Sequence, residues 1–281
     1  INQLFGAAMD AEQARAFLAA RSVPCPGGAQ SFEARGLELM GPELYRTFFA
    51  GYTAKQWGRA PSDLPAAVLN RLPFRLSYDD SYFAHRFQGI PEEGYTEMVA
   101  RMLDHPGIAL DLGHRLRRDE AAGHDHVFQT GPLDGWFGHD LGRLGYRTLR
   151  FERIDTEGSG QGCAVMNWPD PDIPWPRVTE HRHFAPWEDH RRTVLHREYA
   201  AECGPGDTPF YPIRLAAETA LLRAYVARAE AERGVTFVGR LGTYRYLDMD
   251  VCVREALDCA RLFLARRQDG GAMPAFAVRP L

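Results

Sequence analysis

The stretch Val235–Asp250, VTFVGRLGTYRYLDMD, is the part of the sequence that says most about the fold. The apolar run Val235–Val238 predicts a buried strand, and the glycines that follow it predict a loop. Asp248 and Asp250 then open a long helix. A strand, a glycine loop and a helix N-terminus together offer backbone N–H groups and a positive dipole end to an anion.

Arg240 lies within this glycine loop and adds a bidentate donor for a phosphate. The alternative is a plain connection between a strand and a helix, with Asp248 or Asp250 as an ordinary N-cap. The residues alone leave both interpretations open.

The pattern of the first hundred residues predicts helices, and the pattern of the middle of the chain predicts strands. Helical patterns cover 10–20, 32–57 with an interruption near Gly41-Pro42, 92–103, 214–232 and 250–267. The last two are each expected to present one apolar face: Leu215, Leu222, Tyr225, Val226 and Ala229 in 214–232, and Val253, Leu257, Ala260 and Leu264 in 250–267. Short segments rich in β-forming residues cover 126–130, 146–151, 163–167, 178–184 and 193–199. The fold class is therefore mixed α/β, with a mainly helical subdomain over 1–105, an antiparallel-rich sheet subdomain over 106–213 and a third part over 214–281.

The composition is that of an ordinary globular protein. With 33 basic and 37 acidic residues, the formal net charge is −4, which gives no electrostatic reason to expect a nucleic acid partner. No apolar window reaches the ~18 residues that a membrane span needs. The five cysteines include no CxxC pair, and a cytoplasmic location is expected.

Two histidines, His181 and His183, would share one face if their segment were a strand. No third ligand follows at a recognised spacing, so we expect histidines of a sheet and no metal site.

Several segments carry rings and arginines that suit a binding site. The segment Asn167–Arg177, NWPDPDIPWPR, cannot be helical, because proline removes donors and restricts its neighbours. The segment Gly51–Gly58, GYTAKQWG, holds the only lysine of the chain, Lys55, which we expect to face solvent or to pair locally. Each of these segments taken alone also fits a surface loop or a ring in a core.

Taken together, the arginines and rings are those that a nucleotide diphosphate sugar requires. Guanidinium groups neutralise a diphosphate, rings stack on a base, and phenols bond to sugar hydroxyls. This set comprises Arg71, Arg177, Arg240, Tyr52, Trp57, Tyr82, Tyr211 and Tyr246.

Eight motifs in order carry a family resemblance. They are GYTAKQWG, RLPFR, DDSYF, FQGIPEEGYTEM, TGPLDGWF, PWPRVTEH, GDTPFYP and GRLGTYRYLDMD. Together they closely resemble prokaryotic UDP-galactopyranose mutase, from about Ile1 to the C-terminus. The resemblance implies an isomerase that interconverts UDP-galactopyranose and UDP-galactofuranose through an adduct of the sugar with flavin N5, with reduced FAD as cofactor. It also implies a homodimer and a role in cell-surface galactan synthesis.

The resemblance assigns roles to residues of this chain. Arg71, on a mobile loop near 70–80, and Arg177 would be the catalytic arginines on the diphosphate. The substrate-binding set would be Phe48, Tyr52, Thr53, Trp57, Tyr82, Asn167, Tyr211 and Tyr246. The cofactor-binding set would be Gly239, Arg240, Asp248 and Met249, with Thr130 and Gly131 nearby, and residues 214–281 would form the C-terminal part of a Rossmann-like FAD-binding domain.

One departure from the family pattern concerns the flavin. The family begins with a strand and a dinucleotide-binding glycine fingerprint, and no G-x-G-x-x-G follows a predicted strand here. The expectation is a fragment of a longer polypeptide or a chain that has lost its flavin domain. A non-catalytic UDP-sugar-binding module is therefore the alternative function.

Overall fold

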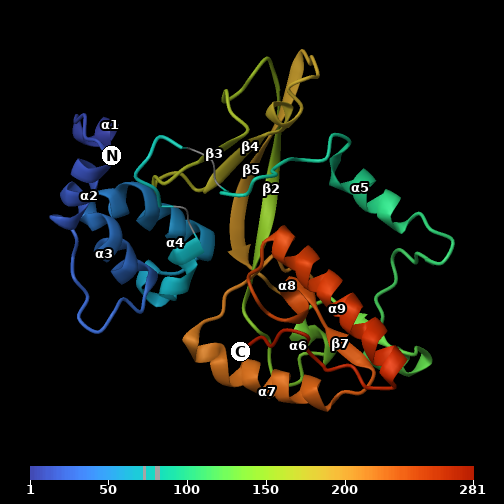
Figure 1. Ribbon diagram of the computed structural model, residues 1–281. Coiled ribbons are helices and arrows are strands. Elements are labelled where there is room, and N and C mark those ends of the chain that lie inside the picture. The colour runs from blue at the N-terminus through green and yellow to red at the C-terminus, as the bar shows by residue number, and fades with distance from the viewer. Residues whose placement is uncertain (72–73, 80–82) are drawn as a thin grey trace. The chain divides into compact units, whose positions relative to one another are not determined.

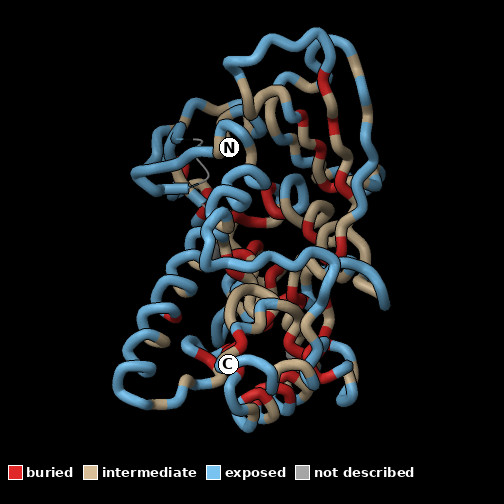
Figure 2. The backbone as a smooth tube through the Cα atoms, turned by 90° about the vertical axis from the view of Figure 1, so that its right-hand side faces the viewer, coloured by how far each residue is buried: buried red, intermediate tan, exposed pale blue. Residues whose placement is uncertain are grey.

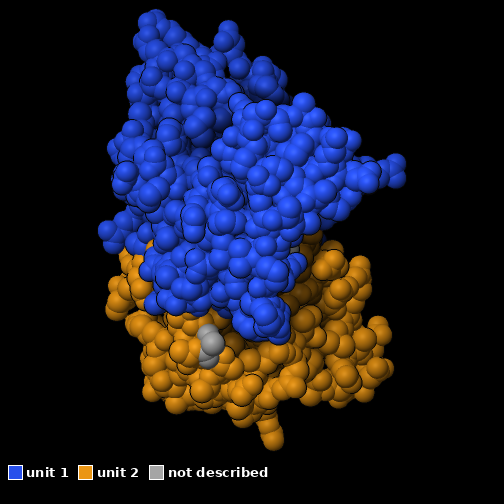
Figure 3. All heavy atoms as spheres, turned by 90° about the vertical axis from the view of Figure 1, so that its left-hand side faces the viewer, with its two compact units in different colours: residues 1–110, 149–201 blue, residues 111–148, 202–281 orange. Residues whose placement is uncertain are grey.

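The computed structural model describes residues 1–71, 74–79 and 83–281 (Figure 1). The chain divides into two compact units, coloured separately in Figure 3. Unit 1 comprises residues 1–110 and 149–201, and unit 2 comprises residues 111–148 and 202–281. The subdomain boundaries near 105 and 213 expected from the sequence stay a prediction.

Most helices of unit 1 come from about the first hundred residues, as the sequence predicts. They are α1 (Asn2–Phe5), α2 (Ala11–Ala19), α3 (Phe32–Leu44), the π-helix η1 (Tyr45–Ala50), α4 (Gly51–Trp57), the 3₁₀ helices η2 (Pro61–Asp63) and η3 (Ala66–Arg71), and α5 (Gly94–Leu103). Local capping explains where two of them start, because the side chains of Asp10 and Ser31 accept hydrogen bonds from the first turns of α2 and α3. The predicted interruption lies at Gly41, whose φ of 76° breaks α3 before Pro42.

The sheet of unit 1 is antiparallel and runs in the order β3-β4-β5-β2. Its strands are β3 (Val165–Asn167), β4 (Arg177–Glu180), β5 (Arg192–Glu202) and β2 (Tyr146–Glu157), of which β2 and β5 continue into unit 2. Asn167 lies opposite Arg177, and Arg177 lies opposite Glu198. Directly opposed residues share one face of a sheet, so these three side chains form a row across three strands.

One predicted strand is shorter than expected. The strand predicted over 178–184 ends at Glu180, and the 3₁₀ helix η5 (His181–Phe184) follows it. The carboxylate of Glu180 is fully buried and accepts hydrogen bonds from the backbone N–H groups of Gly160 and Gln161. This contact with a distant turn fixes the end of the strand, and the prediction that His181 and His183 share a strand face is wrong.

Unit 2 holds a parallel pair of strands and a buried apolar cluster. Its elements are η4 (Arg118–Gly123), β1 (Val127–Gln129), α6 (Leu133–Trp136), β6 (Tyr211–Pro212), η6 (Ala216–Glu218), α7 (Thr219–Ala231), β7 (Val235–Phe237), α8 (Gly239–Gly242) and α9 (Met249–Asp269). Strand β1 pairs with β7 in parallel, and β6 pairs with the start of β2. The predicted mixed α/β class is confirmed.

The two faces of the β1–β7 pair meet different helices. Val127 and Phe237 belong to the buried cluster that includes Leu222 and Tyr225 of α7. Figure 2 colours the buried parts of the backbone red. The next residue of β1, Phe128, points to the opposite face, where its ring lies 5.2 Å from the ring of Phe263 on α9. The strand therefore separates a buried face from a more open one.

The apolar face predicted for the C-terminal helix is exposed. Val253, Leu257 and Leu264 of α9 are 58%, 53% and 61% exposed, and Cys259 is its buried residue. The helical period was right, but it does not tell what the face packs against. In α7, by contrast, the predicted face is buried.

Candidate functional site

Arg177 is the centre of the candidate site in unit 1. It starts β4, and its guanidinium donates from Nε to Asn167 Oδ1 at 3.2 Å and from Nη2 to Tyr52 Oη at 2.8 Å. Its Nη1 lies 3.7 Å from Glu198 Oε2. Because each guanidinium nitrogen has a partner, the orientation of the planar group is fixed.

Glu198 is a member of this site that sequence reasoning missed. It is only 6% exposed, and burial raises the pKa of its carboxyl, against the opposing effect of the Arg177 charge. The only sequence signal is an acidic residue at an inward position of a strand. Assigning it a role requires the register between β4 and β5, which one sequence does not supply.

Helix α4 supplies the tyrosine of this cluster. Tyr52 is half-buried and bonds Arg177, whereas Thr53 and Trp57, one helical turn apart, are buried. Phe48 lies on the preceding π-helix and is 46% exposed. The structure therefore brings Tyr52, Asn167 and Arg177 together, while Thr53 and Trp57 face the interior.

Lys55 lies on the same helix and does not behave as expected. Its ammonium donates to backbone carbonyl oxygens of the segment between β3 and β4, more than 110 residues away in sequence. Burial lowers its pKa, and the charge of Asp170 opposes this shift. The prediction of a solvated or locally paired lysine is wrong, because the partner is brought in by the tertiary fold.

Two predicted residues carry no further description. Arg71 ends η3, but its side chain lies outside the described residues, and Tyr82 lies outside them entirely. Their assignments stay predictions.

A second cluster, in unit 2, holds the other predicted tyrosines. The rings of Tyr211 and Tyr246 are 5.3 Å apart, and the guanidinium of Arg240 lies 5.5 Å and 4.9 Å from their centroids. Arg240 donates from Nε to Leu247 O at 3.0 Å and from Nη1 to Phe210 O at 3.3 Å. These carbonyls adjoin the two tyrosines in sequence, so Arg240 ties the segments that carry them.

The remaining predicted residues lie at the carboxyl ends of the parallel strands. Gly239 follows β7 with a φ of 77°, a conformation that favours glycine. Asp248 is the N-cap position of α9, without a capping hydrogen bond from its side chain, and Met249 is 62% exposed. A Cβ atom on Gly242 would lie 2.5 Å from Gln129 O, so α8 packs directly on the end of β1, where Thr130 and Gly131 follow.

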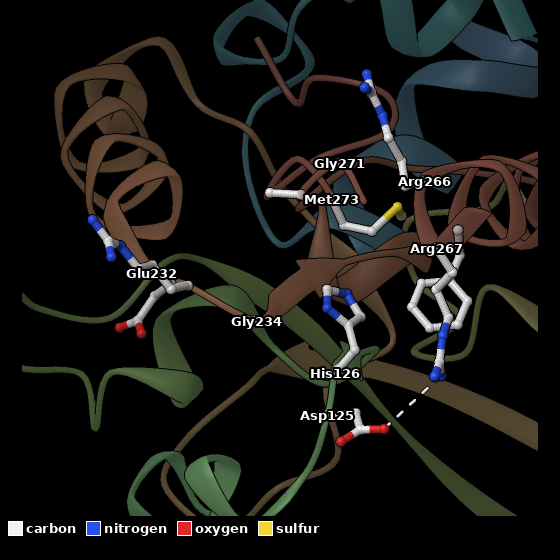
Figure 4. Close-up of a pocket in the computed structure, with 11 residues that line it drawn as sticks. Asp125, His126, Glu232, Gly234, Arg266, Arg267, Gly271 and Met273 are labelled. Atoms are coloured by element: carbon white, nitrogen blue, oxygen red, sulfur yellow. Dashed lines mark ion pairs between the residues drawn. The ribbon is translucent and has the colours of Figure 1, made fainter. Parts of the chain in front are cut away.

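Unit 2 also has a hollow of about 730 Å³, whose lining residues are drawn in Figure 4. It is lined by residues such as His126, Glu232 and Phe263, and Arg267 there lies 3.9 Å from Asp125. None of the predicted site residues lines it. Within the described part of the chain, no group of three His, Cys, Asp or Glu side chains is arranged to hold a metal ion.

Comparison with solved structures defines the fold class first. A structure titled "Crystal structure of reduced UDP-Galactopyranose mutase" aligns with a TM-score of 0.60 at 14% sequence identity, covering 83% of this chain and 67% of that one. At this identity the likeness shows a shared fold.

Sequence comparison then gives the family. A model of the UDP-galactopyranose mutase family matches residues 47–246. A probable UDP-galactopyranose mutase of Klebsiella pneumoniae is 48% identical over 278 residues, covering 99% of this chain and 72% of its own length. A dTDP-fucopyranose mutase of Escherichia coli is 43% identical over 276 residues, covering 96% and 73%. The chain belongs to the UDP-galactopyranose mutase family and is an isomerase of the mutase type.

Over residues 1–71, 74–79 and 83–281, no helix combines the length and the apolar character needed to cross a membrane. The cytoplasmic location and the homodimer expected from the sequence stay predictions.

Proposed function

We propose that this mutase interconverts UDP-galactopyranose and UDP-galactofuranose, with reduced FAD as cofactor, and so supplies a donor for cell-surface galactan. One observation carries the proposal. The family match over residues 47–246 includes every predicted substrate residue from Phe48 to Tyr246, and within it Arg177 is bonded to both Tyr52 and Asn167.

The diphosphate is the part of the substrate for which Arg177 is suited. A guanidinium presents its donors in a rigid plane that matches phosphate oxygens. Tyr52, Asn167 and Glu198 hold that plane before a ligand arrives, which lowers the ordering cost of binding. Arg71 is proposed as the second arginine on the diphosphate.

Tyr211 and Tyr246 are proposed to donate hydrogen bonds from their hydroxyl groups to phosphate oxygens. Arg240 stacks on both rings and is bonded to the carbonyls of Phe210 and Leu247, so its proposed part is to hold these tyrosines in place. Phe48, Thr53, Trp57 and Tyr82 are proposed for the uridine and sugar side.

The residues of unit 2 fit a flavin. Cofactors of α/β proteins bind at the carboxyl ends of parallel strands, and there the chain has Gly239 in a left-handed conformation and the N-terminus of the 21-residue helix α9. Gly239, Arg240, Asp248 and Met249 would hold the group, with Thr130 and Gly131 beside them. When bound, a reduced flavin supplies a nucleophile for the anomeric carbon of the sugar.

The name of one relative supports a second candidate substrate for this chain. The Escherichia coli relative is named a dTDP-fucopyranose mutase, and this chain is 43% identical to it. Fucose is galactose without its 6-hydroxyl group, and thymine is uracil with one added methyl group. The two substrates therefore share the diphosphate that Arg177 is proposed to bind. They differ at the base, at the 2′-hydroxyl group of the ribose, which dTDP lacks, and at carbon 6 of the sugar.

The test is incubation of the protein with dithionite-reduced FAD and UDP-galactofuranose, followed by chromatography for UDP-galactopyranose. A parallel incubation with dTDP-fucofuranose tests the second substrate, and an absorbance spectrum reports whether flavin is retained. Conversion of the UDP-sugar supports the proposal, and conversion of the dTDP-sugar alone replaces its substrate. UDP binding by calorimetry without turnover, beside an active relative, would instead indicate a non-catalytic UDP-sugar-binding module.

A further inference from the structure

We propose that Lys55 is a positioning residue for the substrate site: it holds the segment Trp168–Pro176, here called the proline loop, and thereby sets Asn167 and Arg177. This inference rests on the proposed function, because it assigns those two residues to the nucleotide diphosphate.

The ammonium of Lys55 lies among four backbone carbonyl oxygens of the proline loop. It is 2.5 Å from Trp168 O, 2.8 Å from Asp170 O, 2.9 Å from Ile173 O and 3.3 Å from Trp175 O. Lysine has three N–H donors and no acceptor, so four converging acceptors use its full capacity.

All four carbonyls belong to residues that directly precede a proline. The sequence from 168 to 176 reads WPDPDIPWP, so each of these peptide groups has an oxygen that accepts but no N–H that donates. The loop therefore has more acceptors than its own backbone can satisfy. Leaving such groups without a hydrogen bond in a partly buried place is unfavourable. A side chain that only donates is the complement that this loop requires.

The proline loop is closed at its base by Asn167 and Arg177, the two residues proposed to bind the substrate. Asn167 and Arg177 are paired across β3 and β4, and Trp168 N donates to Pro176 O at 2.8 Å just inside them. Whatever fixes the loop therefore fixes the end of the hairpin that presents Asn167 and Arg177.

Helix α4 meets this hairpin at three successive points. Gly51 approaches Pro169 so closely that a Cβ atom would lie 2.2 Å from its carbonyl oxygen. Tyr52 bonds Arg177, and Lys55, three residues further along the helix, bonds the loop. Residues three apart on a helix lie on one side, so a single helix face fixes both the base and the tip of the hairpin.

The first experiment observes Lys55 directly. Because the chain has one lysine, a sample made with ¹⁵N-lysine gives one side-chain ammonium signal by NMR. We expect its protons to exchange with water much more slowly than those of free lysine. Exchange as fast as that of free lysine overturns the inference, and this measurement needs no variant.

The second experiment measures the effect on the site. Lys55→Met keeps an unbranched side chain of four atoms and removes the ammonium with its donors. Lys55→Arg keeps the charge but replaces the compact ammonium with a planar guanidinium. The matched control is Arg46→Met, which removes a charge from an exposed position of the same helical run. Calorimetry with UDP and hydrogen exchange of the amides flanking the proline loop are the readouts.

We expect Lys55→Met to weaken UDP binding about tenfold or more and to speed amide exchange at Trp168 and Val178, with a smaller effect for Lys55→Arg. Arg46→Met is expected to bind within about twofold of the parent. UDP binding and amide exchange unchanged in Lys55→Met overturn the inference while the proposed function stands. If the parent chain does not bind UDP, the proposed function fails. The ammonium signal and the amide exchange then test by themselves whether Lys55 fixes the proline loop.

Discussion

Arg177 lies directly opposite Glu198 in the antiparallel sheet, with its Nη1 atom 3.7 Å from the carboxylate of that buried residue. Asn167 lies opposite Arg177 on its other side. An arginine between a carboxylate and an amide has its plane fixed by strand register.

Replacing Arg177 with lysine should weaken UDP binding although the charge is kept. A single ammonium cannot bond Tyr52, Asn167 and a phosphate in one plane, so the expected loss is about 1.5–3 kcal/mol, or roughly tenfold to a hundredfold in Kd. Calorimetry with UDP checks this. Arg191→Lys, at an exposed arginine of the same unit, serves as control, and parent-like binding by Arg177→Lys would remove the proposed role.

Gly51 is predicted to be intolerant of any side chain. Its backbone is in an ordinary helical conformation, so the cost of Gly51→Ala comes from the 2.2 Å approach of a Cβ atom to Pro169 O. Thermal or urea unfolding should show a loss of about 1–3 kcal/mol. Gly89→Ala is the matched control, because a Cβ atom there meets nothing within 4 Å and should change stability by less than about 0.5 kcal/mol. Equal stability of the two variants would show that helix α4 can move away from the proline loop.

Much of the fold was predictable because it follows from local pattern. The interruption at Gly41-Pro42, the buried strand before Gly239 and the buried face of α7 rest on proline and glycine chemistry and on the periods of strand and helix. These features depend on residues close in sequence, so one sequence contains them.

The parts that were missed depend on residues far apart in sequence. Strand β4 ends at Glu180 because its carboxylate bonds a turn some twenty residues earlier, and Lys55 bonds a loop more than 110 residues later. Tyr52, Asn167 and Arg177 were predicted individually. The pairing of Arg177 with Glu198 depends on the register between β4 and β5, which the sequence alone does not give. The sequence of one strand does not identify the partner of a charged residue in it.

Glu180 should make stability depend on acid pH. Burial alone would raise the pKa of its carboxyl, but hydrogen bonds from Gln161, Gly160, His183 and Ser159 outweigh it and hold the pKa to about 2. A carboxyl whose folded-state pKa is depressed stabilises the protein above its unfolded-state value of 4.5, and this contribution is lost as the pH falls toward 2.

Urea unfolding of the parent and of Glu180→Gln at several pH values tests this. The stability advantage of the parent over the variant should shrink by about 2 kcal/mol between pH 7 and pH 3. Glu43→Gln, at an exposed position on α3, is the control, and its difference from the parent should stay within about 0.5 kcal/mol. A constant difference for Glu180→Gln across this range contradicts the assignment.

Tyr244 should contribute stability through its hydroxyl group. The residue is fully buried with a φ of 47°, a conformation that costs a non-glycine residue about 1–3 kcal/mol. Its single hydroxyl proton is shared between Gly145 O, 2.7 Å from Oη, and a Glu218 carboxylate oxygen, 2.8 Å away. This shared hydrogen bond offsets that cost and fixes the turn before Tyr246. Tyr244→Phe removes the hydroxyl proton that Gly145 O and the Glu218 carboxylate share, so we expect a loss of about 1–3 kcal/mol in unfolding free energy.

Tyr45→Phe is the matched control for Tyr244→Phe. Tyr45 is also buried, but among the described residues its hydroxyl has no hydrogen-bond partner, and burial raises its pKa to about 12. Removing an unpaired buried hydroxyl relieves a desolvation cost, so Tyr45→Phe should be neutral or slightly stabilising. Thermal unfolding of the two variants at one pH gives the comparison. A loss in Tyr45→Phe as large as that in Tyr244→Phe would mean that the loss comes from deleting any buried hydroxyl group, and not from the hydrogen bonding of Tyr244 to Gly145 and Glu218.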